Sequence, residues 1–382
     1  MSAPLDGVKV LDLSRVLAGP ISGRMLSDLG ADVVKVEPPA GDVTRTYGGR
    51  GGREAAYFRQ QNAGKRSIVI DFTTEDGRGL VLDLAARADV VLENFRPGVL
   101  DRLGLGWAQL SAVNPRLVMM SISGFGQDGP ERSRAAYAGV IHAESGVTAR
   151  TPKRDGLPTD LPISMADVVT GLHGAIGVLA ALRHRDATGF GQHVDVAMLD
   201  AMLVCDDFAA DALDDDRLAR ESPLDESAST ARVAARRPSR AEMIDAPGGP
   251  MIVMGEFKWI WKSINERAGV ADPTPPGADL DTKIACRYAA WQEWVASFQT
   301  REALTAGLDR ANLAWGNVVT TATAAAGPTA THRRSIVEFD DPLGAYSVVQ
   351  SPWRFSNATT GVRGPAPRQD EHRAEIIDEW LG

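Results

Sequence analysis

The stretch VKVLDLSRVLAGPISGRMLSDLGADVVKVE, residues 8–37, contains two short apolar runs separated by a segment of helical pattern. The runs at 8–14 and 32–37 are rich in aliphatic residues on both sides of the chain, which is typical of strands buried under helices on both faces. Between them, residues 21–31 have the length and pattern of an amphipathic helix. The stretch therefore predicts a strand–helix–strand unit with parallel strands.

The same alternation continues along the first half of the chain. A second helix-like segment lies at 77–88, and four further apolar runs are predicted as strands: 67–72, 89–95, 117–123 and 193–199. Strand–helix alternation of this kind predicts an α/β fold with a doubly wound, mainly parallel, Rossmann-like sheet.

The pattern changes after about residue 205. Residues 206–240 have weak periodicity with acidic and then basic runs, so we expect a linker on a protein surface. The PGGP at 247–250 predicts a hairpin turn, and amphipathic helices that carry tryptophans follow it, which together indicate a smaller α+β domain. The predicted organisation is a large domain at 1–200 completed by 345–382, a linker at 201–237, the small domain at 238–315 and a second linker at 316–344.

Composition narrows the function classes. The formal net charge of -9 argues against nucleic acid as a partner, and the two cysteines form no metal or disulfide pattern. The start of the chain lacks the pattern of a signal peptide. The longest apolar helix candidate, 168–182, is interrupted by glycines and is predicted to be a core helix too short for a bilayer. We therefore expect a cytoplasmic protein with no membrane partner and no redox or metal cofactor.

Asp167 stands among small apolar residues where that core helix is predicted to begin. A carboxylate in this position can accept the free N–H groups of the helix, which is a structural role. An ionised carboxylate beside a water-poor pocket can also attack an activated acyl carbon, which is a catalytic role. Tyr137 can donate a hydrogen bond to such a carboxylate or pack in the core. His142 and His173 have no evident partner and are interpreted as structural.

The loop between the first predicted strand and its helix, residues 15–20, lies where doubly wound sheets bind ligands. It matches neither GxGxxG nor GxxxxGK[ST], so these motifs predict no NAD or ATP site here. Four cations near the ends of predicted strands together indicate an anionic ligand: Lys65, Arg66, Arg96 and Arg102.

Several motifs resemble the class III CoA-transferases, the group that includes formyl-CoA and carnitine CoA-transferases and the 2-methylacyl-CoA racemases. The motifs are VLDLSRVLAGP, LGADVVKVEPPAGDVTR, NAGKRSIVIDF, VLENFRPGVLDRLGLG, ISGFGQDGP, YAGV, MADVVTGLHGAIGVLAAL, TGFGQHVDVAMLDA and, in the tail, RGPAPRQDEH. They cover residues 7–205 densely and the end of the chain, and their specificity lies in the whole set. The resemblance implies an interlocked homodimer in which each chain forms a ring threaded by its partner.

The resemblance also implies roles for single residues. Asp167 falls at the nucleophile, and Tyr137 stands where the transferases carry a tyrosine and the racemases a histidine base. A phenol with a pKa of ~10 is a poor base at neutral pH, which favours transfer over racemisation. CoA would contact Arg15, Val16, Ala18, Ile70, Thr73, Asn94, Arg102 and Met198, to which we add Arg96 for its charge and placement. The chain departs from the family pattern at Pro38, often an arginine in relatives, and at Ala138, usually an acidic residue.

The expected function is transfer of CoA from an acyl-CoA donor to a carboxylic acid, through an aspartyl anhydride and an aspartyl-CoA thioester. Coenzyme A is then part of the substrate. A 2-methylacyl-CoA racemase or epimerase is one alternative, and a non-catalytic CoA-binding protein is the other. The sequence predicts neither the donor nor the acceptor, because the divergent small domain and the partner chain shape the pocket.

Overall fold

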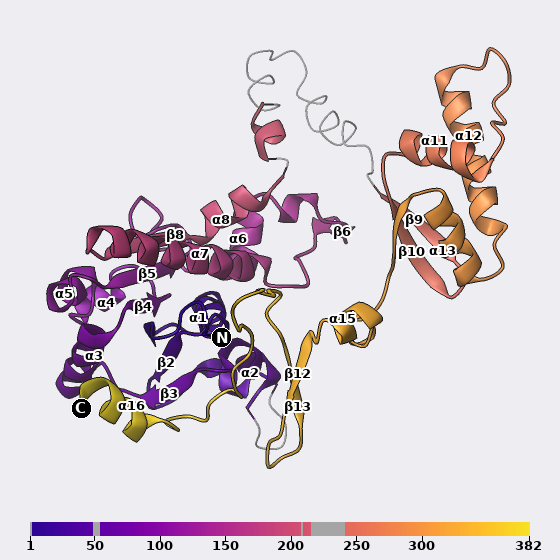
Figure 1. Ribbon diagram of the computed structural model, residues 1–382. Helices are drawn as coiled ribbons and strands as arrows, with labels where there is room; N and C mark the ends of the chain where they lie inside the picture. The colour runs from indigo at the N-terminus through magenta and orange to yellow at the C-terminus, as the bar shows by residue number, and fades with distance from the viewer. Residues whose placement is uncertain (1, 49–53, 208, 215–240) are drawn as a thin grey trace. The chain divides into compact units, whose positions relative to one another are not determined.

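The computed structural model describes residues 2–48, 54–207, 209–214 and 241–382 (Figure 1). The chain divides into a large unit, Met1–Ala209 with Pro328–Gly382, and a small unit, Ala210–Gly327. Each unit has a hydrophobic core of its own.

The large unit is built on a six-stranded sheet in the order β3-β2-β1-β4-β5-β8, in which every neighbouring pair is parallel. Its strands are β1 (Lys9–Asp12), β2 (Asp32–Glu37), β3 (Arg66–Val69), β4 (Val90–Glu93), β5 (Val118–Ser123) and β8 (Gln192–Ala197). The six predicted strands and the parallel α/β sheet are thus confirmed. The strand order reverses between β1 and β4, so the loops that follow these strands diverge at a topological switch point.

Helices cover both faces of this sheet (Figure 1). Residues of α1 and α7 pack on one face, and residues of α3, α5 and α16 pack on the other. These helices are α1 (Ala18–Asp28), α3 (Glu75–Arg87), α5 (Trp107–Val113), α7 (Met165–Thr188) and α16 (Arg373–Leu381). Successive strand residues point to opposite faces, and so Val10 and Leu11 of β1 belong to different cores. The doubly wound architecture is confirmed, whereas the interlocked dimer stays a prediction.

The core helix α7 is longer than predicted. It has 24 residues with a mean hydropathy of 1.6 in its most apolar window, so its length and composition suit a membrane span. The prediction that it is too short for a bilayer is therefore wrong, because the helix extends beyond its apolar run at both ends. Its packing is that of a core helix: a Cβ at Gly171 would lie 2.6 Å from the Ala18 carbonyl oxygen, an approach that only glycine permits.

Shorter elements complete the large unit. The helices among them are α2 (Ala56–Asn62), α4 (Val99–Arg102), α6 (Ala138–Glu144) and α8 (Met198–Cys205), with 3-10 turns at Val43–Thr46 and Thr148–Arg150. A two-residue hairpin pairs β6 (Lys153–Arg154) with β7 (Leu157–Pro158).

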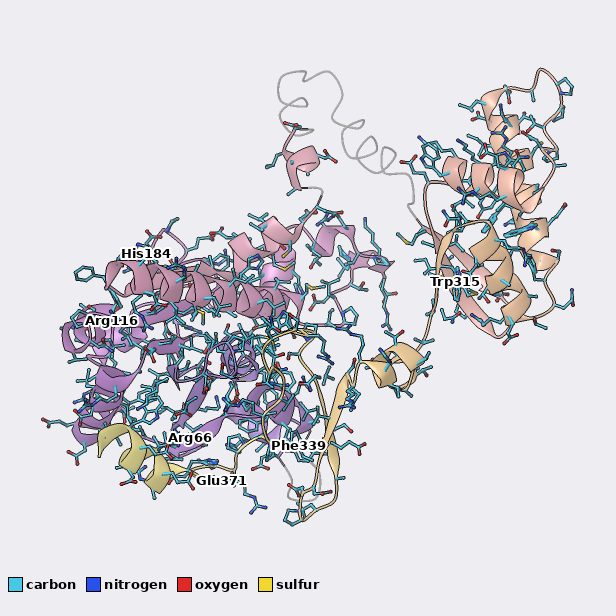
Figure 2. The ribbon with its side chains drawn as sticks, in the orientation of Figure 1. Arg66, Arg116, His184, Trp315, Phe339 and Glu371 are labelled. Carbon is cyan, nitrogen blue, oxygen red and sulfur yellow. The ribbon has the colours of Figure 1, made fainter. Side chains whose placement is uncertain are left out.

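The C-terminal segment returns to the large unit. It contains α15 (Pro328–His332) and an antiparallel pair, β12 (Ile336–Phe339) and β13 (Tyr346–Val349), before α16. The stretch 316–344 thus carries α14 (Thr321–Ala325), α15 and β12. Gln60 of α2 accepts a hydrogen bond from the Val349 N–H at 2.8 Å, and Arg66 pairs with Glu379 of α16 at 2.7 Å. Figure 2 shows Arg66 beside this segment, which is tied to the sheet by such contacts.

The small unit contains an antiparallel sheet in the order β11-β10-β9. Its elements are β9 (Ala241–Ala246), β10 (Gly249–Met254), α11 (Phe257–Ala268), α12 (Leu280–Ala296), α13 (Arg301–Arg310) and β11 (Ala314–Asn317). The hairpin and the tryptophan-bearing helices are confirmed: Trp261 and Trp291 lie in the core, whereas Trp259 is exposed. The stretch 201–237 begins inside α8, and most of it lies outside the described residues.

Candidate active site

Asp167 lies in the first turn of α7, where a helix leaves its N–H groups without partners of its own. The Ser164 side chain at the N-cap makes no capping hydrogen bond. The Asp167 carboxylate accepts hydrogen bonds from the backbone N–H groups of Ala138 and Ala18, the first residues of α6 and α1. Donors from two other helices therefore fix the carboxylate in space and favour its negative charge.

The environment of Asp167 makes it more basic than a surface carboxylate. Burial raises the pKa of Asp167 to about 6, while the N–H groups of Ala138 and Ala18 act in the opposite direction. At neutral pH the group is mostly ionised, yet it is poorly hydrated. Such a carboxylate is a usable nucleophile.

Tyr137 immediately precedes Ala138, whose backbone N–H contacts the Asp167 carboxylate. It is the residue before α6, and its side chain is 69% exposed. In the part of the chain that the structure describes, no hydrogen bond joins its phenol to the Asp167 carboxylate. The hydrogen bond to the Asp167 carboxylate comes instead from the backbone N–H of Ala138.

Tyr57 of α2 is a tyrosine that the sequence analysis missed. Burial raises the pKa of Tyr57 to about 12, and the charge of Asp167 is the next cause. Its ring lies 6.0 Å from that of Tyr47, centroid to centroid. Tyr57 stays a neutral hydrogen-bond donor near the carboxylate. Only the packing of α2 shows this proximity, because nothing in the local sequence distinguishes Tyr57 from a core tyrosine.

His142 has partners that the sequence did not show. The residue is buried in α6, and its Nδ1 lies 2.9 Å from Asp160 Oδ1. Its Nε2 accepts a hydrogen bond from the Ala166 N–H at 3.1 Å, one residue before Asp167. His142 is therefore part of the surroundings of the carboxylate.

The loop after β1 is held in one conformation by residues from other strands. The Asn94 side chain accepts from the Arg15 N–H at 2.8 Å and donates to the Arg15 carbonyl at 2.8 Å, while Asp42 accepts from the Val16 N–H at 3.3 Å. Val16 has a φ of 69°, which is strained for a β-branched residue and persists only where its surroundings impose it. Because such strain clusters at ligand clamps, this loop is a strong candidate for a ligand contact.

Buried charges lie beneath this loop. Lys35 pairs with Asp42 at 3.0 Å and donates to the Ser14 carbonyl at 2.9 Å. Lys65 pairs with Asp12 at 2.8 Å. Burial favours the neutral form of Asp12, but the charges of Lys65 and Lys35 outweigh it and lower the pKa of Asp12. For Asp42, burial is likewise outweighed, here by the charge of Lys35 and hydrogen bonds from Thr44, and the pKa of Asp42 is lowered.

Two of the four cations predicted to bind an anionic ligand have other partners. The Lys65 ammonium donates to Asp12, to the Pro20 carbonyl and to Asn62, which uses all three of its N–H groups. Arg66 pairs with Asp32 and Glu379. The prediction is wrong for these two cations, because partners from distant parts of the chain neutralise them. Arg96 and Arg102 are exposed.

The residues predicted to contact CoA follow the carboxyl ends of four strands. Arg15, Val16 and Ala18 follow β1, Ile70 and Thr73 follow β3, Asn94, Arg96 and Arg102 follow β4, and Met198 follows β8. Arg15 and Asn94 are in direct contact, and the Arg15 guanidinium lies 5.4 Å from the Phe95 ring centroid. Ala18, Ile70 and Met198 are buried, so mainly their backbone is left for a ligand.

A further buried carboxylate, which the sequence analysis missed, ends β4. Glu93 is 4% exposed and accepts hydrogen bonds from the Phe95 N–H at 2.8 Å and from the Ser121 hydroxyl. His193 Nε2 lies 2.8 Å from that hydroxyl, and its ring stacks on Trp107. Burial raises the pKa of Glu93 to about 7. The register that sets Glu93 opposite Ser121 is needed to find this cluster.

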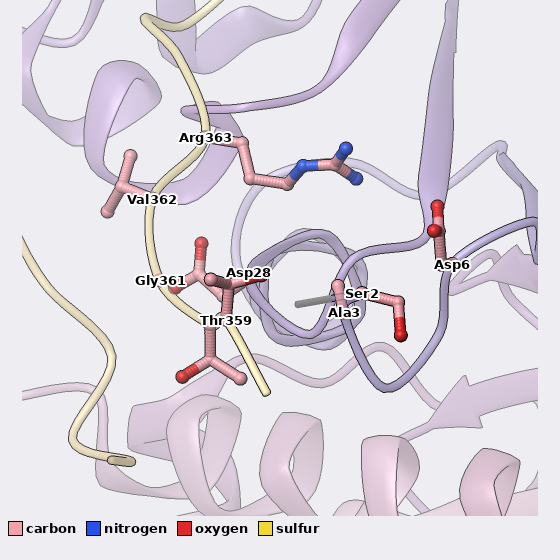
Figure 3. Close-up of a pocket in the computed structure, with 9 residues that line it drawn as sticks. Ser2, Ala3, Asp6, Asp28, Thr359, Gly361, Val362 and Arg363 are labelled. Carbon is pink, nitrogen blue, oxygen red and sulfur yellow. The ribbon is translucent and has the colours of Figure 1, made fainter. Parts of the chain in front are cut away.

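A cavity of about 360 Å³ lies elsewhere in the large unit (Figure 3). The N-terminal segment, Asp28 of α1 and residues 359–363 line it, and none of the residues predicted for catalysis or CoA does. Within the described ranges, no group of three or more His, Cys, Asp and Glu side chains is arranged to hold a metal ion.

Known proteins are similar to this chain over most of its length. A family model described as CoA-transferase family III matches residues 5–373. The chain is 33% identical to the succinyl-CoA:mesaconate CoA-transferase of Haloarcula hispanica, over 98% of this chain and 96% of that one. It is 45% identical over 202 residues to the acetyl-CoA:oxalate CoA-transferase of Acetobacter aceti, a match that spans 52% of each chain.

A solved structure agrees with these matches. The crystal structure of a CAIB/BAIF family protein from Brucella suis has a TM-score of 0.79 and 35% identity to this chain, and the match covers 100% of both. Because the family match runs through both units, and through the carboxylate site of the large one, this protein belongs to CoA-transferase family III and is an enzyme of that family.

Proposed function

We propose that this enzyme transfers CoA from an acyl-CoA donor to a carboxylic acid, with Asp167 as the nucleophile. The observation that carries the proposal is the Asp167 carboxylate, which is mostly ionised at neutral pH, largely removed from water and held by two N–H groups. A carboxylate in such a place can attack an activated acyl carbon directly. The names of the relatives, which pair acyl-CoA donors with carboxylic acids, support the same chemistry.

The first half of the reaction moves CoA onto the enzyme. An Asp167 oxygen attacks the thioester carbonyl of the donor, the C–S bond breaks, and a mixed anhydride and CoA thiolate form. The thiolate then attacks the aspartyl carbonyl of the anhydride. The donor carboxylate leaves, and an aspartyl-CoA thioester remains.

The second half passes CoA to the acceptor. The acceptor carboxylate attacks the aspartyl thioester, CoA thiolate leaves, and a second anhydride forms. The thiolate attacks the acceptor carbonyl of this anhydride, which releases the new acyl-CoA and restores the Asp167 carboxylate. Each step exchanges one activated acyl group for another, so the overall change in free energy is small.

The chain supplies donors for the charges that form in these steps. The N–H groups of Ala18 and Ala138 already bind the carboxylate, and we propose that they stabilise the oxyanion when the aspartyl carbonyl is attacked. Tyr137 is proposed as a catalytic residue whose exposed phenol hydrogen-bonds the reacting acyl group or the acceptor acid. Tyr57, neutral and close to Asp167, is a second donor of the same kind.

We propose that CoA lies along the carboxyl edge of the sheet. The guanidinium groups of Arg15, Arg96 and Arg102 suit its phosphates, because planar guanidinium groups bind phosphate through paired hydrogen bonds. We propose that the remaining predicted contacts, which also follow carboxyl ends of strands, touch other parts of CoA: Val16, Ala18, Ile70, Thr73, Asn94 and Met198.

We also propose that the enzyme is an interlocked homodimer in the cytoplasm. Neighbouring helices α6, α7 and α8 expose large apolar side chains: Val140, Leu172, Ile176, Leu203 and Val204. Apolar surface of this kind marks protein interfaces. In such a dimer the stretches 201–237 and 316–344 connect the large domain, 1–200 with 345–382, to the small domain at 238–315. Native mass spectrometry measures the oligomeric state. A folded monomer that retains transferase activity would refute the dimer.

Intact mass spectrometry tests the nucleophile. The enzyme is incubated with a panel of acyl-CoAs, with hydroxylamine or borohydride as a trap, and modified peptides are mapped. We expect a CoA or acyl adduct on Asp167 and none in the Asp167→Asn variant. Transfer by this variant at the wild-type rate would exclude Asp167 as the nucleophile.

The same enzyme preparations distinguish CoA transfer from the two alternative functions, racemisation and CoA binding without catalysis. A racemase would exchange the α-proton of an acyl-CoA in D2O without any acceptor acid, and we expect no such exchange. A CoA-binding protein without activity would bind the thioesters tightly and transfer none of them.

A further inference from the structure

We infer that His142 is a positioning residue that holds the start of α7, and with it Asp167, in the geometry needed for attack. The inference rests on the proposed role of Asp167 as the nucleophile. His142 belongs to α6, whereas Asp167 belongs to α7, so the contact joins two elements that are separate in the chain. The side chain of His142 is 1% exposed, which leaves its ring little freedom.

Both ring nitrogens of His142 have partners of opposite kind. Nε2 lies 3.1 Å from the Ala166 backbone nitrogen, and Nδ1 lies 2.9 Å from Asp160 Oδ1. Because a backbone N–H can only donate, Nε2 must carry the lone pair and Nδ1 the proton. The contacts therefore select one neutral tautomer of His142.

His142 supplies a cap that α7 lacks. The first N–H groups of a helix have no acceptor within the helix, and Ala166 is the second residue of α7. The side chain of the N-cap residue, Ser164, makes no capping hydrogen bond. The imidazole of another helix thus takes the place of the usual N-cap side chain.

Helix α6 holds adjacent residues of α7 by two bonds of opposite direction. Ala138 and His142 are four residues apart in α6 and hence lie on the same face of it. The Ala138 N–H donates to the Asp167 carboxylate, and His142 accepts from the Ala166 N–H. A shift of the first turn of α7 relative to α6 strains these two bonds, so we infer that the pair sets where the carboxylate points.

Asp160 completes the arrangement from the loop before α7. Its carboxylate is 58% exposed and also accepts from the Leu161 N–H at 2.8 Å. The hydrogen bond from His142 lowers the pKa of Asp160, so Asp160 is ionised at neutral pH and accepts a hydrogen bond from the Nδ1–H of His142. A Cβ at Gly139 would lie 2.9 Å from Asp160 Oδ2, and the glycine leaves room for this carboxylate.

Replacement of His142 in the full-length enzyme tests the inference. His142→Ala removes the acceptor for Ala166. His142→Gln keeps it, because the amide oxygen can accept from Ala166 and the amide N–H can donate to Asp160. His184→Gln is the matched control: His184 lies on the same helix, about 25 Å along its axis from Asp167, and is labelled in Figure 2. Steady-state kcat and KM for an acyl-CoA are measured for all variants.

A positioning role predicts a loss in kcat that the conservative variant restores. We expect kcat of His142→Ala to fall about 10- to 100-fold with KM within about 2-fold of wild type. His142→Gln should keep kcat within about 3-fold of wild type, and His184→Gln should match wild type. A wild-type kcat for His142→Ala, an equal loss in His142→Gln, or a change in KM alone would overturn the inference.

Further variants keep the test decisive. If His142→Ala does not fold, Asp160→Ala replaces it, because this side chain is mostly exposed. We expect kcat of Asp160→Ala to fall about 3- to 10-fold, and a wild-type value would overturn the inference. Asp167→Asn belongs in the same series: transfer by that variant would refute the proposed nucleophile itself. Loss of transfer in Asp167→Asn with a wild-type kcat in His142→Ala would refute the role of His142 alone.

Discussion

Asp167 and the two aspartates beneath the β1 loop are all shielded from water, yet they have opposite properties. Backbone N–H groups hold the Asp167 carboxylate, and burial raises its pKa to about 6. Asp12 and Asp42 are each paired with a lysine, which outweighs burial and lowers their pKa. The difference follows from the partners: a full positive charge makes a buried carboxylate a stable anchor, whereas N–H dipoles leave it basic enough to react.

The Asp167 site depends on the charged pairs beneath the β1 loop. The charged pairs hold the β1 loop through Ser14 and Val16, and this loop leads into Ala18, whose N–H contacts Asp167. The lysine–aspartate pairs thus fix the Ala18 N–H that binds Asp167. Because neither lysine is paired with Asp167 itself, its carboxylate stays reactive.

The largest expected effect comes from removing the reactive carboxylate. Asp167→Asn should lower transfer at least about 1,000-fold, because the amide is not a nucleophile. The same variant should be more stable than wild type by about 1–3 kcal/mol at pH 7.5, since the amide avoids the unfavourable burial of a charge. Urea unfolding at pH 7.5 and pH 4 measures this.

The Asp167→Asn variant is expected to be more stable, and not less, because folding raises the pKa of Asp167. A carboxyl whose pKa is raised on folding destabilises the protein above its unfolded pKa, and fully so above its folded pKa of about 6. The gain of Asp167→Asn should therefore shrink as the pH falls from 6 to 4. A variant less stable than wild type at pH 7.5 would remove the contrast with Asp12 and Asp42.

The second effect concerns the anchors. Lys35→Met leaves Asp42 buried without its cation and should destabilise the large unit by about 3–5 kcal/mol. The KM for acyl-CoA should rise as well, because Asp42 then no longer holds Val16 in its strained conformation. Urea unfolding and steady-state kinetics measure the two effects.

An exposed pair is the control for this variant. Arg134→Ala removes ion pairs with Glu131 and Glu144 at the surface, and it should change stability by less than about 1 kcal/mol. If Lys35→Met costs no more than Arg134→Ala, the buried pairs are not anchors.

The smallest expected effect is at Glu93, a buried carboxylate that forms no ion pair with any residue that the structure describes. Burial raises its pKa to about 7, so its ionised form destabilises the fold above pH 7 and its protonated form does not. Glu93→Gln should match wild type at pH 4 and be more stable by about 1–3 kcal/mol at pH 8. Thermal unfolding across this range measures it, and a difference that is the same at both pH values would contradict the shift.

The sheet was predictable because its signal is local. Each strand is a short aliphatic run, and the strand–helix alternation places these runs in a parallel sheet. The end of α7 was not predictable from its apolar run, since the helix continues through polar residues to Thr188. Asp167 was found because it combines a helix start with a family motif, whereas Tyr57 and Glu93 have no such local signature.

Local pattern and motif thus sufficed for the doubly wound fold, for the family and for the position of the carboxylate at the head of a helix. The properties of each charged group were set by the folded chain, because a pKa depends on neighbours that are remote in sequence. Lys65, taken for a ligand contact, neutralises Asp12 from 53 positions away. His142, taken for an isolated residue, caps α7 from 24 positions before Ala166.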